Sequence, residues 1–258
     1  MRVDAAGMGR IAEAAALDAL ARRRVVLLGE RHDSAADHAW QARVIEGIAA
    51  RVGRVTVGFE MFPRRAQPAL DAFAAGRCGL EAFLDAARWR EVWGFDPRLY
   101  RGLFELCRDR GLGMLALNVD RPIVTLVGRE GWAALPEAER AWLSEAAPAA
   151  PAYRRYLFDV TGGARPDRAA KAPDAPEFDR FVRAQQVWDR AFACAIANHL
   201  AQSPGECVVG LIGRGHLEYG FGTPAQLADL GVEGVAVALP SDAPANARRA
   251  AEFTWPGP

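Results

Sequence analysis

The chain of 258 residues lacks the charge imbalance that marks several specialised classes of protein. Its 32 lysines and arginines equal its 32 aspartates and glutamates, so the formal net charge is zero. Nucleic-acid-binding proteins usually carry a basic excess, and this balance argues against such a partner. Hydrophobic residues make up 51% and charged residues 25%, which is typical of a folded protein with a sizeable core.

The sequence also lacks long apolar runs and closely spaced cysteines. No stretch reaches the roughly 18 apolar residues of a membrane-spanning helix. Asp4, Glu13 and Asp18 interrupt the first twenty residues, and neither a secretory signal nor a lipoprotein cysteine is evident. As written, the chain is therefore expected to be cytoplasmic. The four cysteines are far apart, which disfavours zinc sites and disulfides and favours buried free thiols.

What the sequence does contain is a series of short β-branched or apolar runs, typical of buried strands. These runs are Arg24–Glu30, Arg54–Glu60, Leu112–Asn118, Cys207–Gly213 and Gly234–Pro240. Helical patterns separate most of them, and this alternation predicts right-handed β-α-β crossovers. We therefore expect one domain with a three-layer α/β/α fold, a mostly parallel sheet of about five strands and a helical insertion or cap.

The expected sheet core covers about residues 24–118 and 206–240, and the helical insertion covers about 79–110 and 121–202. The longest helical pattern runs from Pro176 to about Gln202. Before it, the Gly-, Pro- and Ala-rich segment 162–176 predicts a flexible loop. The central helices form either a cap over the sheet or its outer layers, and the sequence pattern fits both.

Two predicted strands end in the same pattern. The strings VVLLGERH and VVGLIGRGH both place a glycine three residues before a histidine, as Gly29-x-x-His32 and Gly213-x-x-His216. Ligand sites in parallel α/β sheets lie at the carboxyl ends of the strands, where the following loops open a crevice. Each histidine alone also fits a helix cap or a loop hydrogen bond. The two together favour a shared site.

Two carboxylates end strands at the same level, namely Glu30 and Glu60. With His32 and His216 they predict a water-activating site, or one for a divalent metal such as Mn held by His32, Glu60 and His216. All four are candidate catalytic residues, with Glu30 as a general base. A salt bridge to an arginine is the structural alternative for each glutamate. His38 follows His32 on the next predicted helix.

Tyr219 lies between glycines in the string GHLEYGFGTP. A tyrosine phenolate is a hard anionic ligand that binds ferric haem in some proteins. Structural tyrosines are far more common, so a structural role also fits. The sequence contains no G-x-S-x-G, P-loop or H-E-x-x-H motif that would indicate another chemistry.

Three segments carry a family resemblance: Leu27–Gln41, Gly58–Phe73 and Ile212–Pro224. Together they resemble the ChaN-like haem-binding uptake family of the Tiki superfamily, and the likeness extends from about residue 24 to 239. The resemblance implies a haem-binding protein in iron or haem uptake or handling. It implies candidate haem-binding residues at Tyr219, His216, His32 and His38.

A haem-binding function leads us to expect a homodimer, and the resemblance leaves a second function open. A haem face would need a second subunit to cover it, with the porphyrin stacked on aromatics such as Phe62, Phe221, Trp89 or Trp93. The alternative is a metal-dependent hydrolase of the Tiki superfamily that uses the paired G-x-x-H histidines and the strand-end glutamates. Family members are often exported lipoproteins, whereas this sequence shows no such signal.

Overall fold

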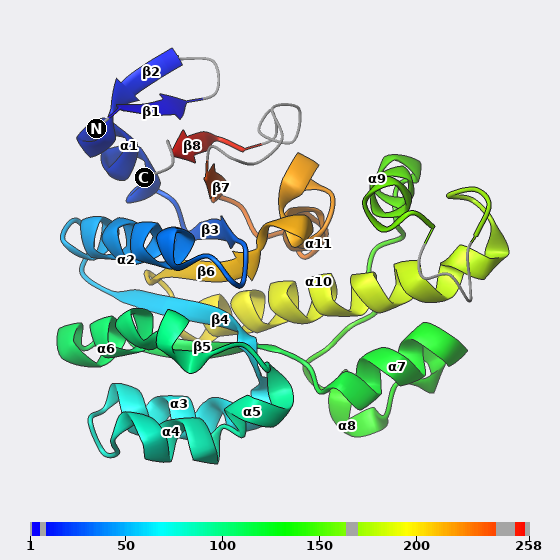
Figure 1. Cartoon of the computed structure of the whole chain (residues 1–258), viewed down its shortest axis with the longest axis horizontal. Coiled ribbons are helices and arrows are strands. Elements are labelled where there is room, and N and C mark those ends of the chain that lie inside the picture. The colour runs from blue at the N-terminus through cyan, green and yellow to red at the C-terminus, as the bar shows by residue number, and fades with distance from the viewer. Residues whose placement is uncertain (1, 6–8, 164–169, 241–250, 256–258) are drawn as a thin grey trace.

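The computed structural model describes residues 2–5, 9–163, 170–240 and 251–255, and a single eight-stranded sheet forms its centre (Figure 1). The strands are β1 (Arg2–Ala5), β2 (Gly9–Ala12), β3 (Val25–Glu30), β4 (Val55–Pro63), β5 (Gly113–Asn118), β6 (Cys207–Gly213), β7 (Val235–Pro240) and β8 (Phe253–Trp255). Their order across the sheet is β2-β1-β8-β7-β3-β6-β4-β5. All neighbours from β8 to β5 are parallel, whereas β1 is antiparallel to β2 and β8.

The five predicted strands correspond to β3, β4, β5, β6 and β7, and the predicted strand number was too low. The three additional strands, β1, β2 and β8, extend one edge of the sheet. They are only three or four residues long, and β2 is largely exposed, so none has the apolar run that marks a buried strand. They form because strands distant in sequence pair there, Asp4 with Thr254 and Ala5 with Phe253.

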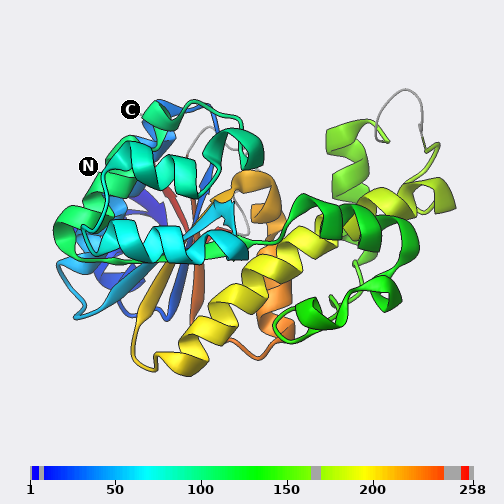
Figure 2. The ribbon, with the colours of Figure 1, turned by 90° about the horizontal axis from the view of Figure 1, so that it is seen from below.

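Helices cover both faces of the sheet, which confirms the predicted α/β/α layers (Figures 1 and 2). The α-helices are α1 (Glu13–Leu20), α2 (Ala35–Ala49), α3 (Gln67–Ala74), α4 (Leu80–Ala86), α5 (Trp89–Val92), α6 (Arg101–Arg110), α7 (Arg121–Glu130), α8 (Glu137–Arg140), α9 (Pro151–Thr161), α10 (Pro176–Gln202) and α11 (Thr223–Asp229). Alternate residues of β3 enter two separate cores. Val26 and Leu28 pack with α1 and α2, whereas Val25 and Leu27 pack with α10 and α11.

An aromatic core holds α4, α5 and α6 against β4. Phe104 is fully buried at its centre, with the rings of Phe59, Phe62, Phe83 and Trp89 at centroid distances of 5.3–5.7 Å. Phe62 and Trp89 are almost completely inaccessible here. They therefore cannot stack against a porphyrin, contrary to the sequence-based expectation, because the helices that follow β4 enclose them.

Helix α10 crosses the sheet and continues beyond it, as predicted from its long helical pattern (Figure 2). Its N-terminal half lies among α7, α8 and α9, and α9 packs on it through Tyr153, Leu157, Phe178 and Val182. Part of the predicted flexible loop, residues 164–169, lies outside the described residues. In the described ranges no helix is both long and apolar enough to cross a membrane.

The four cysteines are free thiols, as expected from their spacing. Cys107, Cys194 and Cys207 are buried, and Cys78 is half-buried. Burial raises the pKa of Cys107 to about 12 and that of Cys207 to about 11. Both thiols therefore stay protonated and act as small apolar side chains.

Candidate functional site

The predicted site residues follow three adjacent strands, β3, β6 and β4. Glu30 ends β3 and is the register partner of Gly213, which ends β6. On the other side of β6, the Gly213 backbone N–H donates a hydrogen bond to the Glu60 carboxylate of β4. His216 lies in a short 3-10 turn, η4 (Arg214–His216), directly after β6. The sheet register therefore brings these strand ends to one edge of the fold.

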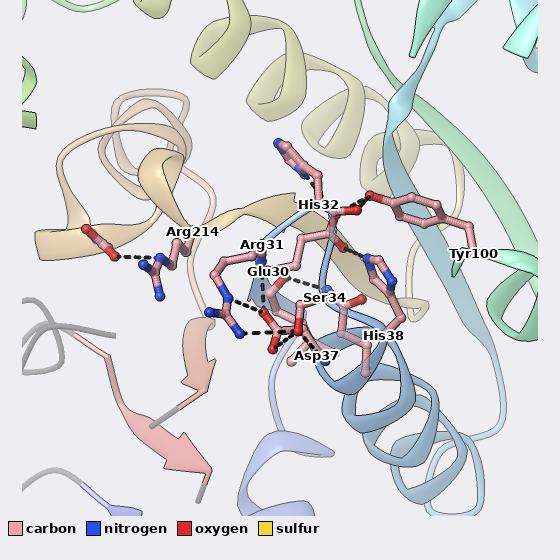
Figure 3. Close-up of polar contacts among 11 residues, drawn as sticks. Glu30, Arg31, His32, Ser34, Asp37, His38, Tyr100 and Arg214 are labelled. Carbon is pink, nitrogen blue, oxygen red and sulfur yellow. Dashed lines mark hydrogen bonds and ion pairs between the residues drawn. The ribbon is translucent and has the colours of Figure 1, made fainter. Parts of the chain in front are cut away.

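The loop after β3 is held by a helix cap. Ser34 is the N-cap of α2, where its hydroxyl accepts a hydrogen bond from the Asp37 N–H at 3.2 Å. The Asp37 carboxylate accepts from the Arg31 N–H at 2.8 Å (Figure 3). These local bonds fix the turn between Glu30 and α2, and so they fix the backbone that carries His32.

Glu30 lies behind His32 and orients it. His32 Nδ1 is 3.0 Å from Glu30 Oε1, and the Tyr100 hydroxyl donates to the same oxygen at 2.8 Å (Figure 3). His38 Nε2 lies 3.5 Å from the other oxygen. Burial alone would raise the pKa of Glu30, but its hydrogen bonds and charge interactions with His32 and His38 outweigh burial and lower it to about 2. Glu30 is therefore an ionised, buried partner that reaches the cleft only through His32.

A second buried carboxylate orients His216 in the same way. Asp189 of α10 is fully buried, and its Oδ1 is 2.9 Å from His216 Nδ1. The Tyr153 hydroxyl of α9 donates to Oδ2 at 2.5 Å. Burial would lower the pKa of His216, but the charge and hydrogen bond of Asp189, with the charge of Glu60, raise it to about 9. Sequence reasoning missed Asp189, although an acidic residue between Trp188 and Phe192 on an apolar helix face is the signal that marks it.

Glu60 lies between the two histidines. His216 Nε2 is 3.8 Å from Glu60 Oε1. A Cβ atom placed on Gly213 would lie 3.0 Å from His32 Nε2 and 3.3 Å from Glu60 Oε2, so His32 and Glu60 meet over this glycine. Burial would lower the pKa of His32, but the Glu30 hydrogen bond and the charges of Glu60 and Glu30 raise it. The Nε2 atom of His216 therefore contacts the Glu60 carboxylate, and the His32 ring lies next to the same carboxylate.

We expect Gly213→Ala to displace His32. The added Cβ would lie 2.7 Å from His32 Cε1, closer than nonbonded carbon atoms pack. Overpacking of this kind costs about 1–3 kcal/mol of unfolding free energy. Urea denaturation measures that loss, and the His32 ring resonances in NMR spectra report the displacement. Gly53→Ala is the control, because a methyl group at that position would have no other atom within 4 Å. Unchanged His32 resonances in Gly213→Ala would contradict the packing described here.

The three groups line an open cleft of about 780 Å³. Trp93 and Phe95 form part of its wall, where the His32 ring meets Trp93 edge-on at 4.6 Å and Phe95 at 5.4 Å. Trp188 of α10 also lines the cleft, 6.4 Å from the ring of His216. The rest of the lining is largely polar and includes Arg65, Arg88 and Arg121, so the cleft combines a few aromatic rings with convergent charged groups.

Tyr219 lies outside this cleft, in the turn η5 (Glu218–Gly220). Its backbone φ of +59° is in the left-handed region, where non-glycine residues are strained. The half-buried ring stacks on Phe221 at 5.4 Å and meets Tyr156 at 5.3 Å. Of the predicted haem-binding residues, His32 and His216 therefore line the cleft, and Tyr219 does not.

The four tyrosines of the chain differ in what their hydroxyls contact. Tyr100 donates to Glu30, Tyr153 to Asp189, and Tyr156 to Glu218 at 2.8 Å. Within the described ranges, no hydrogen bond forms to the Tyr219 hydroxyl.

The remaining candidates are less favourably placed for a ligand. His38 is 3% exposed, and its ring packs on Tyr100 at 4.2 Å, so it is enclosed behind Glu30. Among the residues that the structure describes, no three His, Cys, Asp or Glu side chains form a group placed to hold a metal ion. The roles of His38 in cofactor binding and of His32, Glu60 and His216 in metal binding stay predictions.

The fold and the site define a class of protein: a mostly parallel α/β sheet whose strands end in two G-x-x-H elements around a glutamate. Residues 16–227 match the family model described as "Haem-binding uptake, Tiki superfamily, ChaN", and the chain belongs to this family. The resemblance found in the sequence is thereby confirmed. The chain has no match among curated proteins.

Solved structures show the same fold. ChaN of Campylobacter jejuni, from a study of cofacial heme binding, superposes with a TM-score of 0.74 at 20% identity, covering 95% of this chain and 91% of that one. The type III effector HopBA1 gives 0.54 at 11% identity, covering 94% and 91%. A mutant of the erythromycin esterase EreC in its open conformation gives 0.52 at 12% identity, covering 87% and 71%. At these identities the likeness concerns the fold.

Proposed function

We propose that this protein binds haem through Tyr219 and serves in iron or haem handling. Its membership of a haem-binding uptake family supports the ligand. We choose Tyr219 because its hydroxyl has no hydrogen-bond partner among the described residues. The hydroxyls of the other three tyrosines donate to buried carboxylates. A phenolate is a ligand that ferric haem accepts.

The surroundings of Tyr219 suit a flat apolar ligand. Phe221 and Tyr156 flank its ring, and all three are half-buried. Strained backbone is retained where the surrounding structure holds a functional residue, and the left-handed conformation of Tyr219 fits that pattern. If haem binds, its ferric iron would supply a centre that accepts an oxygen ligand. The chain supplies the oxygen and the adjoining aromatic surface.

Tyr219 and Phe221 would face a bound haem from one side, and a second subunit would be needed to cover the other. We therefore propose that haem binding is accompanied by homodimerisation. Sedimentation of the protein with and without haem tests this: the dimer fraction rises with haem. If the protein stays monomeric in the presence of saturating haem, the dimer proposal is refuted, whereas the proposal of haem binding is not affected.

Titration with ferric haem tests the proposed ligand. The wild-type protein is expected to shift the Soret band at micromolar haem, and Tyr219→Phe is expected to bind at least about tenfold more weakly, or about 1.4 kcal/mol. Tyr156→Phe is the matched control, since it removes a neighbouring hydroxyl that is already bonded to Glu218. Equal affinities of wild type and Tyr219→Phe would refute the ligand assignment, and no Soret change in the wild type would refute haem binding.

The alternative function, a metal-dependent hydrolase, gains no separate support from the comparisons. The esterase is 12% identical, so that similarity describes the fold and not the chemistry. The geometry at the strand ends nevertheless has features that haem binding at Tyr219 leaves unexplained.

A further inference from the structure

We infer that the three arginines lining the cleft, Arg65, Arg88 and Arg121, form a subsite for the carboxylate or phosphate group of a small-molecule ligand. The inference goes beyond haem binding and does not depend on it, because Tyr219 lies outside the cleft. It rests on the convergence of the three side chains, on the open N-terminus of α7 and on the strained backbone of Arg88.

The three arginines come from separate segments and meet around Asp120. Arg65 lies in the short turn that directly follows β4, and its Nε is 2.6 Å from Asp120 Oδ1. Arg121 follows Asp120 directly and begins α7. Glu91, and to a smaller extent the charge of Asp120, raise the pKa of Arg88, so Asp120 is near this guanidinium as well. All of these residues line the cleft.

The carboxylates that pair with two of the arginines leave hydrogen-bond donors for a ligand. Asp120 contacts Arg65 through Nε, and Glu91 contacts Arg88 through one terminal nitrogen. A guanidinium carries five N–H donors in a planar fork, so each pair leaves several of them unused. Within the described ranges the exposed Arg121 guanidinium has no ion pair. Carboxylates and phosphates fit such forks through two parallel hydrogen bonds.

The charge around Asp120 favours an anion. Three guanidiniums face two carboxylates there. The third acid that lines the cleft, Glu60, accepts a hydrogen bond from the Gly213 N–H and lies beside His216. The arginines therefore exceed the carboxylates that contact them by one charge.

The N-terminus of α7 adds a second contribution of the same sign. Asp120 is the N-cap residue of this ten-residue helix, yet its side chain does not cap the helix and contacts Arg65 instead. Arg121 and Pro122, in the first turn, both line the cleft. An uncapped helix N-terminus attracts negatively charged ligands, and here it lies next to the free guanidinium of Arg121.

The backbone of Arg88 is strained in a way that its own ion pair does not explain. Its φ of +55° is in the left-handed region, just after the end of α4, where glycine is favoured. The side chains of Arg88 and Glu91 are 55% and 60% exposed, and exposed pairs contribute little to stability. Strained residues persist where they hold a functional side chain in place, and we assign that role to Arg88.

Calorimetric titration of haem-free protein with citrate and with pyrophosphate tests the subsite. At least one of them is expected to bind with a Kd below about 1 mM, and the tighter one shows whether the natural group is a carboxylate or a phosphate. Binding of neither at about 10 mM would overturn the proposal.

Arg121→Ala is expected to weaken this binding about tenfold, the effect of losing a charged hydrogen bond. Arg129→Ala is the matched control: Arg129 is on the same helix and 59% exposed, but it does not line the cleft. An equal loss in both variants would reduce the effect to general electrostatic attraction and overturn the subsite.

Arg88→Gly separates binding from folding. Glycine adopts a positive φ without strain, so the urea midpoint is expected to stay equal or rise, while anion binding weakens at least about fivefold. Wild-type affinity in Arg88→Gly would overturn the role of Arg88. Tyr219→Phe is expected to bind the anion as the wild type does, and a loss of anion binding in this variant would merge the subsite with the haem site and overturn the proposal.

Discussion

Asp189→Ala is expected to lower the free energy of unfolding by about 3–5 kcal/mol, the range observed when one partner of a buried ion pair is removed. Asp189 is fully buried and accepts from Tyr153, His216 and Thr223. Alanine leaves a charged imidazole and two hydroxyls without their partner. Urea denaturation followed by circular dichroism measures the loss, and Asp109→Ala is the control because its carboxylate is 61% exposed.

The same pair makes the wild-type stability depend on pH. The pKa of His216 is raised to about 9 in the folded state, above about 6.5 in the unfolded chain. A raised folded pKa means that the stabilisation is fully present below about pH 6.5 and is lost as the pH rises through about 9. The difference corresponds to about 3 kcal/mol.

Asp189→Asn separates this effect from general alkaline unfolding. The amide retains the size of the side chain and removes the charge that holds the proton on His216. Its unfolding free energy is expected to change little between pH 6 and 9, whereas that of the wild type falls. An equal fall in both proteins would assign the pH dependence to other groups.

Phe104→Ala is expected to cost about 3–5 kcal/mol of unfolding free energy, the usual loss for a buried phenylalanine. Phe104 is fully buried, and its neighbours Phe59, Phe62, Phe83 and Trp89 come from β4, α4 and α5. No single neighbour can move into the space without breaking its own ring contacts. The cavity therefore stays largely open.

Equilibrium denaturation of Phe104→Ala and Phe104→Leu checks this expectation, with leucine giving a smaller loss because it fills part of the space. Val160→Ala is the control: its side chain is 66% exposed, and surface changes usually stay within about 0.5 kcal/mol. A loss for Phe104→Ala as small as that for Val160→Ala would mean that the aromatic core does not hold α4 and α5 in place.

The sequence predicted the central part of the fold because these elements are determined locally. The predicted strand Cys207–Gly213 has the same bounds as β6, and the helix predicted from Pro176 to about Gln202 has the same bounds as α10. The edge strands were missed for the opposite reason. β1 exists because it pairs with β8, about 250 positions away, and a four-residue strand has no apolar pattern of its own.

The residues of the site also fall into two groups, those that the sequence predicted and those that it missed. His32 and His216 were predicted because a histidine after a strand is visible in sequence. Asp189 lies 27 positions before His216 on another element, and Tyr100 lies 70 positions after Glu30. Which side chain meets which depends on the path of α10 and α6 over the sheet, and no local pattern contains that information.

The late pairing of β3 has a consequence for biosynthesis. Its two neighbours in the sheet are β6 and β7, and the partner of Val25 in β6, Val208, follows 183 positions later. At about 5–20 residues per second, a ribosome needs about 10–40 s to reach it. During that time the apolar segment VVLLGE has no partner strand, so we expect the yield of folded protein to depend on temperature during expression. The two histidines can meet only when translation is nearly finished.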